Sequence, residues 1–198
     1  MASKGLPEDY IPSIKEVEWF LNNWQNLPNY SNQEKALDKL FMDLCKFNDN
    51  IEDILIKCST LNDFYSTNIY DVYSVAQHLF KIDRIDERLK NGDPLLIKDI
   101  AKVKVGKAKT ERTFYSFATK YCSFHQPTLF PIYDSYVEKV LWELKNRVEF
   151  SVFKLSELKD YPKFKKVVDD FRNHYGLTEF NYKELDQYLW QLGKKYFG

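Results

Sequence analysis

The chain has 198 residues, of which 44% are hydrophobic and 29% charged, and its formal net charge at pH 7 is zero. This balance is typical of a globular protein and excludes an intrinsically disordered chain, and the length suits one hydrophobic core. No run of about 18 apolar residues occurs, and the N-terminus lacks the apolar region of a signal peptide, so we expect neither membrane spanning nor export. The three cysteines form no CxxC pair, which favours a reducing, cytoplasmic setting without a structural zinc.

Apolar residues recur at three- and four-residue spacing along most of the chain, which predicts an all-α fold. No segment alternates strictly between apolar and polar residues over five or more positions with turn signals on both sides, as a half-buried strand would. We expect a single multi-helical domain of about ten helices over residues 1–198. In chain order, the predicted helices cover residues 14–24, 31–44, 50–58, 68–91, 95–102, 109–124, 135–146, 161–175 and 181–197.

Several of these boundaries have specific signals. Ser31 with Glu34 has the spacing of a capping box, in which each side chain bonds the other residue's backbone N–H. Asn50 is placed to cap the third helix, and Asn181 with Glu184 three residues later to open the last one. The pair Asn91-Gly92 is a typical helix end.

Charge is divided unevenly between the two halves of the chain. Residues 1–94 contain 10 Lys and Arg against 16 Asp and Glu, whereas residues 95–198 contain 19 against 13. An acidic helical half and a basic half therefore follow one another, and the basic half could face a polyanion. The strongest cluster is the segment 98–120, which has seven basic residues and only two acidic ones.

This segment predicts a nucleic-acid interface. Lysine and arginine neutralise phosphates, and backbone N–H groups at a helix start after the Gly106 turn could hold one. A solvated lysine face without a ligand is the competing interpretation. The predicted nucleic-acid-binding residues are Lys102, Lys104, Gly106, Lys107, Lys109 and Arg112.

Two motifs resemble the helix-hairpin-helix base-excision DNA glycosylases. The stretch Val103-Lys104-Val105-Gly106 is similar to the hairpin of that family, although lysine replaces its first glycine, and PIYDSYVEKVL is similar to the segment that delivers a catalytic aspartate to a helix start. The resemblance implies a helix-hairpin-helix glycosylase-like C-terminal half and a catalytic role for Asp134. The lysine of the bifunctional members is not matched, because Ala108 or Ser116 stands in its place.

A helix cap explains Asp134 equally well. An aspartate directly before a helical run accepts hydrogen bonds from the first free backbone N–H groups. His125, Tyr133 and Tyr136 are the nearest candidates for a pocket around this carboxylate. His125 is either a general base there or a residue that interacts with the carbonyl groups at the end of its helix.

A second likeness covers the C-terminal half. The stretches SFATKYCSFHQPTLFPIYDSYV and YKELDQYLWQLGKKYF are similar to a family of small bacterial proteins without an assigned activity. In the last helix, Tyr188 and Trp190 could stack a base, but a wide apolar face of this kind usually packs against neighbouring helices. We therefore expect both rings to belong to the core.

Three functions follow from these observations. The leading hypothesis is a helical protein that binds DNA and has no catalytic activity. The first alternative is a protein-interaction module that binds a partner chain or forms a homodimer, and the second is a monofunctional DNA glycosylase that uses Asp134. No cofactor or metal ion is expected, because no glycine-rich phosphate loop or metal-ligand spacing is present.

Overall fold

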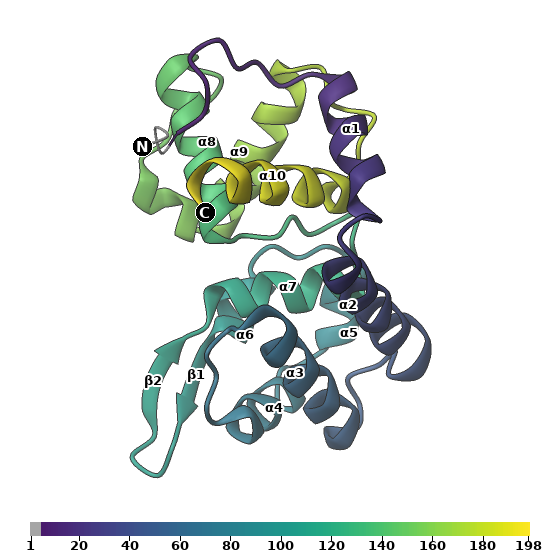
Figure 1. Ribbon diagram of the computed structural model, residues 1–198. Helices are drawn as coiled ribbons and strands as arrows, with labels where there is room; N and C mark the ends of the chain where they lie inside the picture. The colour runs from purple at the N-terminus through teal and green to yellow at the C-terminus, as the bar shows by residue number, and fades with distance from the viewer. Residues whose placement is uncertain (1–4) are drawn as a thin grey trace. The chain divides into compact units, whose positions relative to one another are not determined.

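A computed structural model describes residues 5–198, which divide into two units. One unit consists of the residues up to Pro28 together with residues 131–198, and the other of residues 29–130. Ten α-helices and one short two-stranded sheet make up most of the described chain (Figure 1), so the predicted all-α class is confirmed. That the whole chain forms a single domain stays a prediction.

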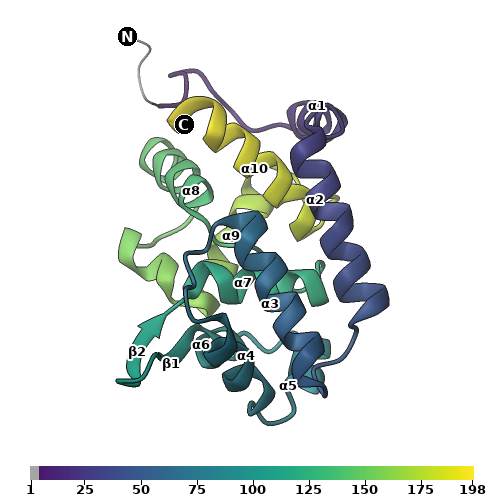
Figure 2. The same ribbon diagram turned by 60° about the horizontal axis from the view of Figure 1, so that its bottom comes forward.

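The unit of residues 29–130 contains most of α2 and five further α-helices. Helix α3 packs against α4 and α7, and α6 packs against α7 (Figure 2). Their facing sides bury aliphatic and aromatic residues completely, among them Ile54, Leu79, Ile100 and Phe117. The elements are α2 (Pro28–Lys39), a π-helical turn (Leu40–Leu44), α3 (Ile51–Tyr65), α4 (Val72–Phe80), α5 (Ile85–Lys90), α6 (Leu96–Ala101), β1 (Lys102–Val105), β2 (Thr110–Thr113) and α7 (Tyr115–His125).

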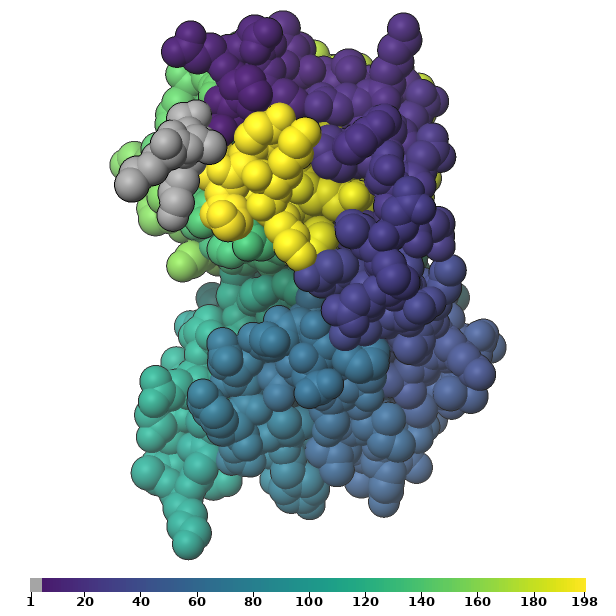
Figure 3. Space-filling model, viewed as in Figure 1, coloured from purple at the N-terminus to yellow at the C-terminus, as the bar shows by residue number. Residues whose placement is uncertain are grey.

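The predicted helix from Lys109 is wrong in its first part, because residues 102–113 form a β-hairpin. Strands β1 and β2 pair antiparallel, with Lys104 opposite Glu111. Gly106 and Lys109 both have positive φ angles, 70° and 53°, which lie outside the right-handed helical region. The next helix, α7, begins only at Tyr115. The helix-hairpin-helix turn expected at Gly106 is therefore absent from these residues, and the hairpin turn projects from the surface of its own unit (Figure 3).

Two other helix boundaries differ from the prediction. Helix α2 begins at Pro28, so Ser31 and Glu34 are buried interior residues of α2 and form no capping box at its start. Proline fits the first turn of a helix, where its missing N–H is not needed. The single helix predicted over residues 68–91 is divided into α4 and α5, and Arg84 between them is in the left-handed region with a φ of 49°.

Helix α3 begins where the sequence predicted but continues seven residues beyond Cys58, to Tyr65, whereas the remaining predicted boundaries agree with the structure to within one residue. The side-chain oxygen of Asn50 accepts hydrogen bonds from the backbone N–H groups of Glu52 (2.8 Å) and Asp53 (3.2 Å). Asn181 and Glu184 form the predicted capping box, with distances of 3.1 and 2.8 Å. These caps are local, so sequence spacing alone is sufficient to predict them.

The second unit contains four α-helices around an aromatic core. Helix α10 packs against α8 and α1 (Figures 1 and 2). Tyr188 is fully buried, as predicted, and its hydroxyl lies 2.7 Å from that of Tyr10. The elements are α1 (Ile14–Trp24), α8 (Ser135–Arg147), a 3-10 turn (Leu155–Lys159), α9 (Tyr161–His174) and α10 (Tyr182–Phe197).

Gly193 permits the close contact between α10 and α8. A Cβ atom at Gly193 would lie 2.5 Å from Cβ and 3.0 Å from Cα of Tyr136. Both atoms belong to the rigid part of a helix, so they cannot move aside without shifting α8. The two helices therefore require glycine at this position.

We expect Gly193→Ala to lower the free energy of unfolding by roughly 1–3 kcal/mol, because overpacking outweighs the gain of about 1 kcal/mol in helix propensity. Chemical denaturation followed by circular dichroism measures the change. The control is Asn22→Ala, an exposed position of α1 that should change stability by no more than about 0.5 kcal/mol. Equal stability of Gly193→Ala and the wild type would contradict the close packing.

Candidate functional site

Asp71 holds the β-hairpin next to α4. One carboxylate oxygen accepts a hydrogen bond from the backbone N–H of Ser74 (3.1 Å) and so caps α4, while the other accepts one from Gly106 in the hairpin turn (2.7 Å). Hydrogen bonds from the Ser74 hydroxyl, the Gly106 amide and the Ser74 amide lower the pKa of Asp71, so it is ionised at neutral pH. The Gly106 amide, which the sequence suggested as a phosphate ligand at a helix start, donates to this carboxylate instead.

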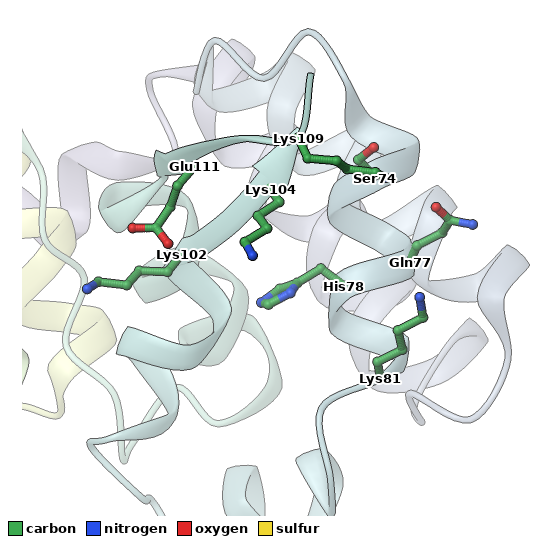
Figure 4. Close-up of a pocket in the computed structure, with 8 residues that line it drawn as sticks. All are labelled: Ser74, Gln77, His78, Lys81, Lys102, Lys104, Lys109 and Glu111. Carbon is green, nitrogen blue, oxygen red and sulfur yellow. The ribbon is translucent and has the colours of Figure 1, made fainter. Parts of the chain in front are cut away.

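A cavity of about 320 Å³ lies between the hairpin and α4. In Figure 4, the side chains of Lys104 and His78 point toward one another across it, and Lys109 extends toward Ser74. We call this cavity the lysine cleft. Its lining residues are Ser74, Gln77, His78, Lys81, Lys102, Lys104, Lys109 and Glu111.

The lysine cleft is positively charged. Four lysines line it against one carboxylate, that of Glu111. Among residues 5–198, none of these four lysines lies within 4.0 Å of a carboxylate oxygen, although Lys109 interacts electrostatically with Asp71. Their ammonium groups are exposed and hydrated, so an anionic ligand could replace water around several of them at once.

The strand pattern decides which predicted basic residues reach the cleft. Side chains alternate between the two faces of a strand, so Lys102 and Lys104 share one face with Glu111. Val103 is buried on the opposite face, where its cross-strand partner Arg112 also lies. Lys107, in the exposed turn, does not line the cleft either. The structure thus brings together Lys102, Lys104 and Lys109 and leaves the other two basic residues outside.

Helix α4 contributes cleft residues that the sequence did not indicate. Ser74, Gln77, His78 and Lys81 precede the basic segment 98–120 by 17 to 24 residues, and no local pattern links the two. The imidazole Nε2 of His78 donates a hydrogen bond to the backbone carbonyl of Asp99 (2.7 Å), which fixes the ring at the cleft. Ser74 and Gln77 add neutral hydrogen-bonding groups to the lysines.

His125 lies in a buried polar cluster of the same unit, not at an exposed helix end. Lys57 is fully buried, and its Nζ donates to the carbonyl of Phe47 (2.9 Å), to Oδ1 of Asn48 (2.8 Å) and to Nε2 of His125 (3.3 Å). Asn48 in turn donates its side-chain amide to Asp86 (2.5 Å) and its backbone amide to the same carboxylate (3.0 Å). His125 is thus an acceptor for a lysine and not a cation near carbonyl groups.

Burial sets the protonation states of this cluster. It lowers the pKa of Lys57 to about 8, although nearby acidic groups oppose the shift. Burial also lowers the pKa of His125 well below its usual value, and the charge of Lys57 acts in the same direction. The imidazole is therefore neutral at pH 7, with the proton on Nδ1. Lys57, Asn48 and His125 are all buried, which favours a structural role for them.

Asp134 caps α8, as the local interpretation predicted. A single oxygen, Oδ1, accepts hydrogen bonds from the backbone N–H groups of Tyr136 (2.8 Å) and Val137 (2.9 Å). Tyr133 is buried and donates its hydroxyl to Glu138. Tyr136 packs edge-on against Trp190, with ring centroids 6.3 Å apart. These residues belong to the unit that contains α8, whereas His125 belongs to the other unit, and a pocket or catalytic role for them stays a prediction.

The described residues contain neither a metal-binding cluster nor a membrane-spanning helix. No group of three or more His, Cys, Asp and Glu side chains within residues 5–198 could hold a metal ion. No described helix is both long and apolar enough to cross a membrane.

The chain belongs to the family defined by the HI_0787 N-terminal domain, whose family model matches residues 16–129. That match includes the whole lysine cleft and ends one residue before the unit of residues 29–130 does. An "Uncharacterized protein" of Haemophilus influenzae (strain ATCC 51907 / DSM 11121 / KW20 / Rd) is 49% identical over 147 residues, which are 74% of this chain and 69% of the relative. No solved structure matches the chain.

These comparisons confirm membership of a family with a bacterial relative, but the matched region differs from the expected one. The sequence suggested that the likeness covers the C-terminal half, whereas the family model covers residues 16–129. Neither comparison names a DNA glycosylase.

Removal of the Asp71 carboxylate tests how the cleft is held. We expect Asp71→Ala to increase the hydrogen-exchange rate of the Gly106 amide several-fold, because that N–H loses a charge-assisted acceptor. Asp83→Ala, in the exposed loop before α5, is the control and should leave the Gly106 rate unchanged. An unchanged rate in Asp71→Ala would show that the tether does not hold the turn.

The buried imidazole of His125 predicts that the folded protein loses stability in mild acid. The folded-state pKa of His125 is below its unfolded value of about 6.5, so the unfolded state takes up the proton first as pH falls. Stability should decrease below about pH 6.5, by up to roughly 1.4 kcal/mol per pH unit. Urea denaturation between pH 7 and 5.5 measures this slope.

His125→Gln should remove most of that slope, since glutamine keeps a hydrogen-bond acceptor for Lys57 but does not titrate. His78→Gln, which replaces the half-buried histidine of the lysine cleft, is the matched control and should preserve the slope. Parallel pH profiles for the wild type and His125→Gln would show that the buried imidazole does not cause the acid sensitivity.

Proposed function

We propose that the unit of residues 29–130 binds nucleic acid through the lysine cleft. The observation that carries this proposal is the convergence of Lys81, Lys102, Lys104 and Lys109 on one cavity, without an ion pair among the described residues. Phosphate oxygens are the ligands that such a group of ammonium ions recognises, and each phosphate bound releases condensed counterions.

The basic residues of the hairpin fall into two groups. Lys102, Lys104 and Lys109 line the cleft, whereas Lys107 and Arg112 are exposed on the turn and on the other face of the hairpin. A phosphate backbone that enters the cleft could thus have a second phosphate near the outer basic residues. Contacts of this kind position a nucleic acid but carry no base sequence information, so we expect binding with little sequence preference.

The proposal includes no catalytic step. One oxygen of Asp134 is used as a helix cap, and this residue belongs to the unit that does not contain the lysine cleft. The glycosylase alternative has no further observation in its favour. Binding of DNA or RNA without chemistry is therefore the function that the geometry supports best.

A protein-interaction module remains the second candidate, because aromatic side chains are exposed around the start of α4. Tyr70 is 97% exposed and Tyr73 is 55% exposed. Exposed aromatic rings in the same region are typical of protein interfaces. This function predicts a complex or homodimer that persists when the lysines of the cleft are neutralised.

The test is the salt dependence of binding to a fluorescent 20-base-pair DNA duplex and a matching single strand, measured by anisotropy from about 50 to 200 mM salt. The wild type should bind at the lowest salt and lose affinity steeply as salt increases. Lys104→Gln with Lys109→Gln should bind duplex more weakly, and the negative slope of log affinity against log salt should become shallower by about 2, roughly one for each lost phosphate contact.

The control for this experiment is Lys159→Gln, which removes one exposed lysine from the other unit. It should leave affinity and slope close to those of the wild type. The proposal is wrong if the wild type binds neither probe at the lowest salt, or if the double variant keeps the wild-type slope.

A further inference from the structure

A second cavity, of about 350 Å³, lies in the unit that contains α1 and α10. The residues that line it come from α1, the short segment after α1, and the second half of α10. It is lined mainly by apolar atoms, and two tryptophans are among its lining residues. The lining residues used below are Trp19, Asn26, Trp190, Gln191, Lys194 and Lys195.

Trp19 presents an indole ring to solvent at this cavity. The residue is 54% exposed, and its ring packs edge-on against Phe20 with centroids 4.9 Å apart. A large aromatic side chain held in this way on a helix has an open face on which another planar ring can stack. Trp190, expected from the sequence in the core, is only half-buried and forms another part of the lining.

Positive charge accompanies these rings. The Nζ of Lys194 lies 4.8 Å from the ring centroid of Trp190, and that of Lys195 lies 5.9 Å from the ring centroid of Trp19. The lining has no carboxylate, although Glu16 lies close enough to Lys195 to interact electrostatically. The cavity therefore favours a ligand with a planar ring and a negative charge a few ångströms from it.

Two side-chain amides, those of Asn26 and Gln191, also line the cavity. The side-chain amide nitrogen of Asn26 donates to Asn23 (3.3 Å), and that of Gln191 donates to the carbonyl of Phe20 (3.0 Å). These bonds fix both side chains while their carbonyl oxygens remain acceptors. A ring with polar edges is therefore a better match than a purely hydrocarbon one.

We propose that this cavity binds one unpaired nucleotide of a single-stranded nucleic acid. The base stacks on Trp19, and Lys194 and Lys195 contact the adjoining phosphates. A site for a free nucleotide would enclose most of the ligand's surface. The half-exposed Trp19 instead leaves one side open, as required when the strand continues beyond the site.

This inference rests on the proposed function only in taking nucleic acid as the ligand. The residues that line this cavity are separate from those that line the lysine cleft. It adds a preference for single strands, because a base paired inside a duplex cannot stack on a protein side chain without leaving its neighbours. The two sites can consequently be tested independently.

The experiment measures binding of a fluorescent six-nucleotide DNA strand, a 20-base-pair duplex and adenosine monophosphate at about 50 mM salt. Trp19→Ala should weaken binding of the short strand by roughly 5- to 100-fold, the range for loss of one stacked base, while duplex affinity stays within twofold. Trp19→Phe keeps an aromatic ring and should restore most of the affinity. Circular dichroism verifies that both variants are folded.

Three results would overturn the inference: no binding of the short strand, an affinity of Trp19→Ala within twofold of the wild type, or adenosine monophosphate binding as tightly as the strand. The variant Lys104→Gln with Lys109→Gln separates this test from that of the lysine cleft. Unchanged duplex affinity in that variant would refute the lysine cleft alone, and a loss of strand binding only in Trp19→Ala would still support the stacking site.

Discussion

The geometry of the lysine cleft depends on the carboxylate of Asp71. It caps α4 through Ser74 and holds the hairpin turn through Gly106, so two segments more than thirty residues apart in the chain are fixed next to one another. An ionised acceptor forms stronger hydrogen bonds than a neutral one, and the lowered pKa of Asp71 keeps this acceptor ionised. The lysines of β1 and the polar residues of α4 line one cavity as a consequence.

The same unit also contains a cluster of buried polar side chains around Lys57. Lys57 is fully buried, yet its ammonium donates to Phe47, Asn48 and His125, and Asn48 connects it to the carboxylate of Asp86. A buried charge without such partners would cost several kcal/mol. The cluster therefore gives the core a specific arrangement, while the exposed lysines of the cleft keep their charges available for a ligand.

The sequence predicted the helical class well because helix periodicity and caps are local. Asn50 and Asn181 cap the helices that their spacing indicated. The hairpin was missed because each strand has only four residues, too few for alternation to stand out from helical spacing, and Gly106 alone does not distinguish a β-turn from a turn between helices. Arg84 divides α4 from α5 in a left-handed conformation that few arginines adopt, so no residue-type rule predicts it.

For the site, the sequence identified the charge but not the geometry. Lys102, Lys104 and Lys109 were predicted from their clustering, whereas His78 and its neighbours on α4 could be assigned to the cleft only from tertiary structure. His125 shows the converse: its residue type suggested a catalytic role, but its partners are the buried side chains of Lys57 and Asn48. The half-exposed Trp190 likewise differs from the buried position that an apolar stripe indicates, although its ring contacts those of Trp24 and Tyr136.

The most direct test of this account is an NMR titration of the ¹⁵N-labelled chain with a short DNA duplex at about 50 mM salt. Backbone amide shifts should change in residues 102–111 and around His78 on α4, and the changes should reverse as salt is added. No shift changes at the hairpin, or changes confined to residues 131–198, would contradict the assignment of phosphate binding to the lysine cleft.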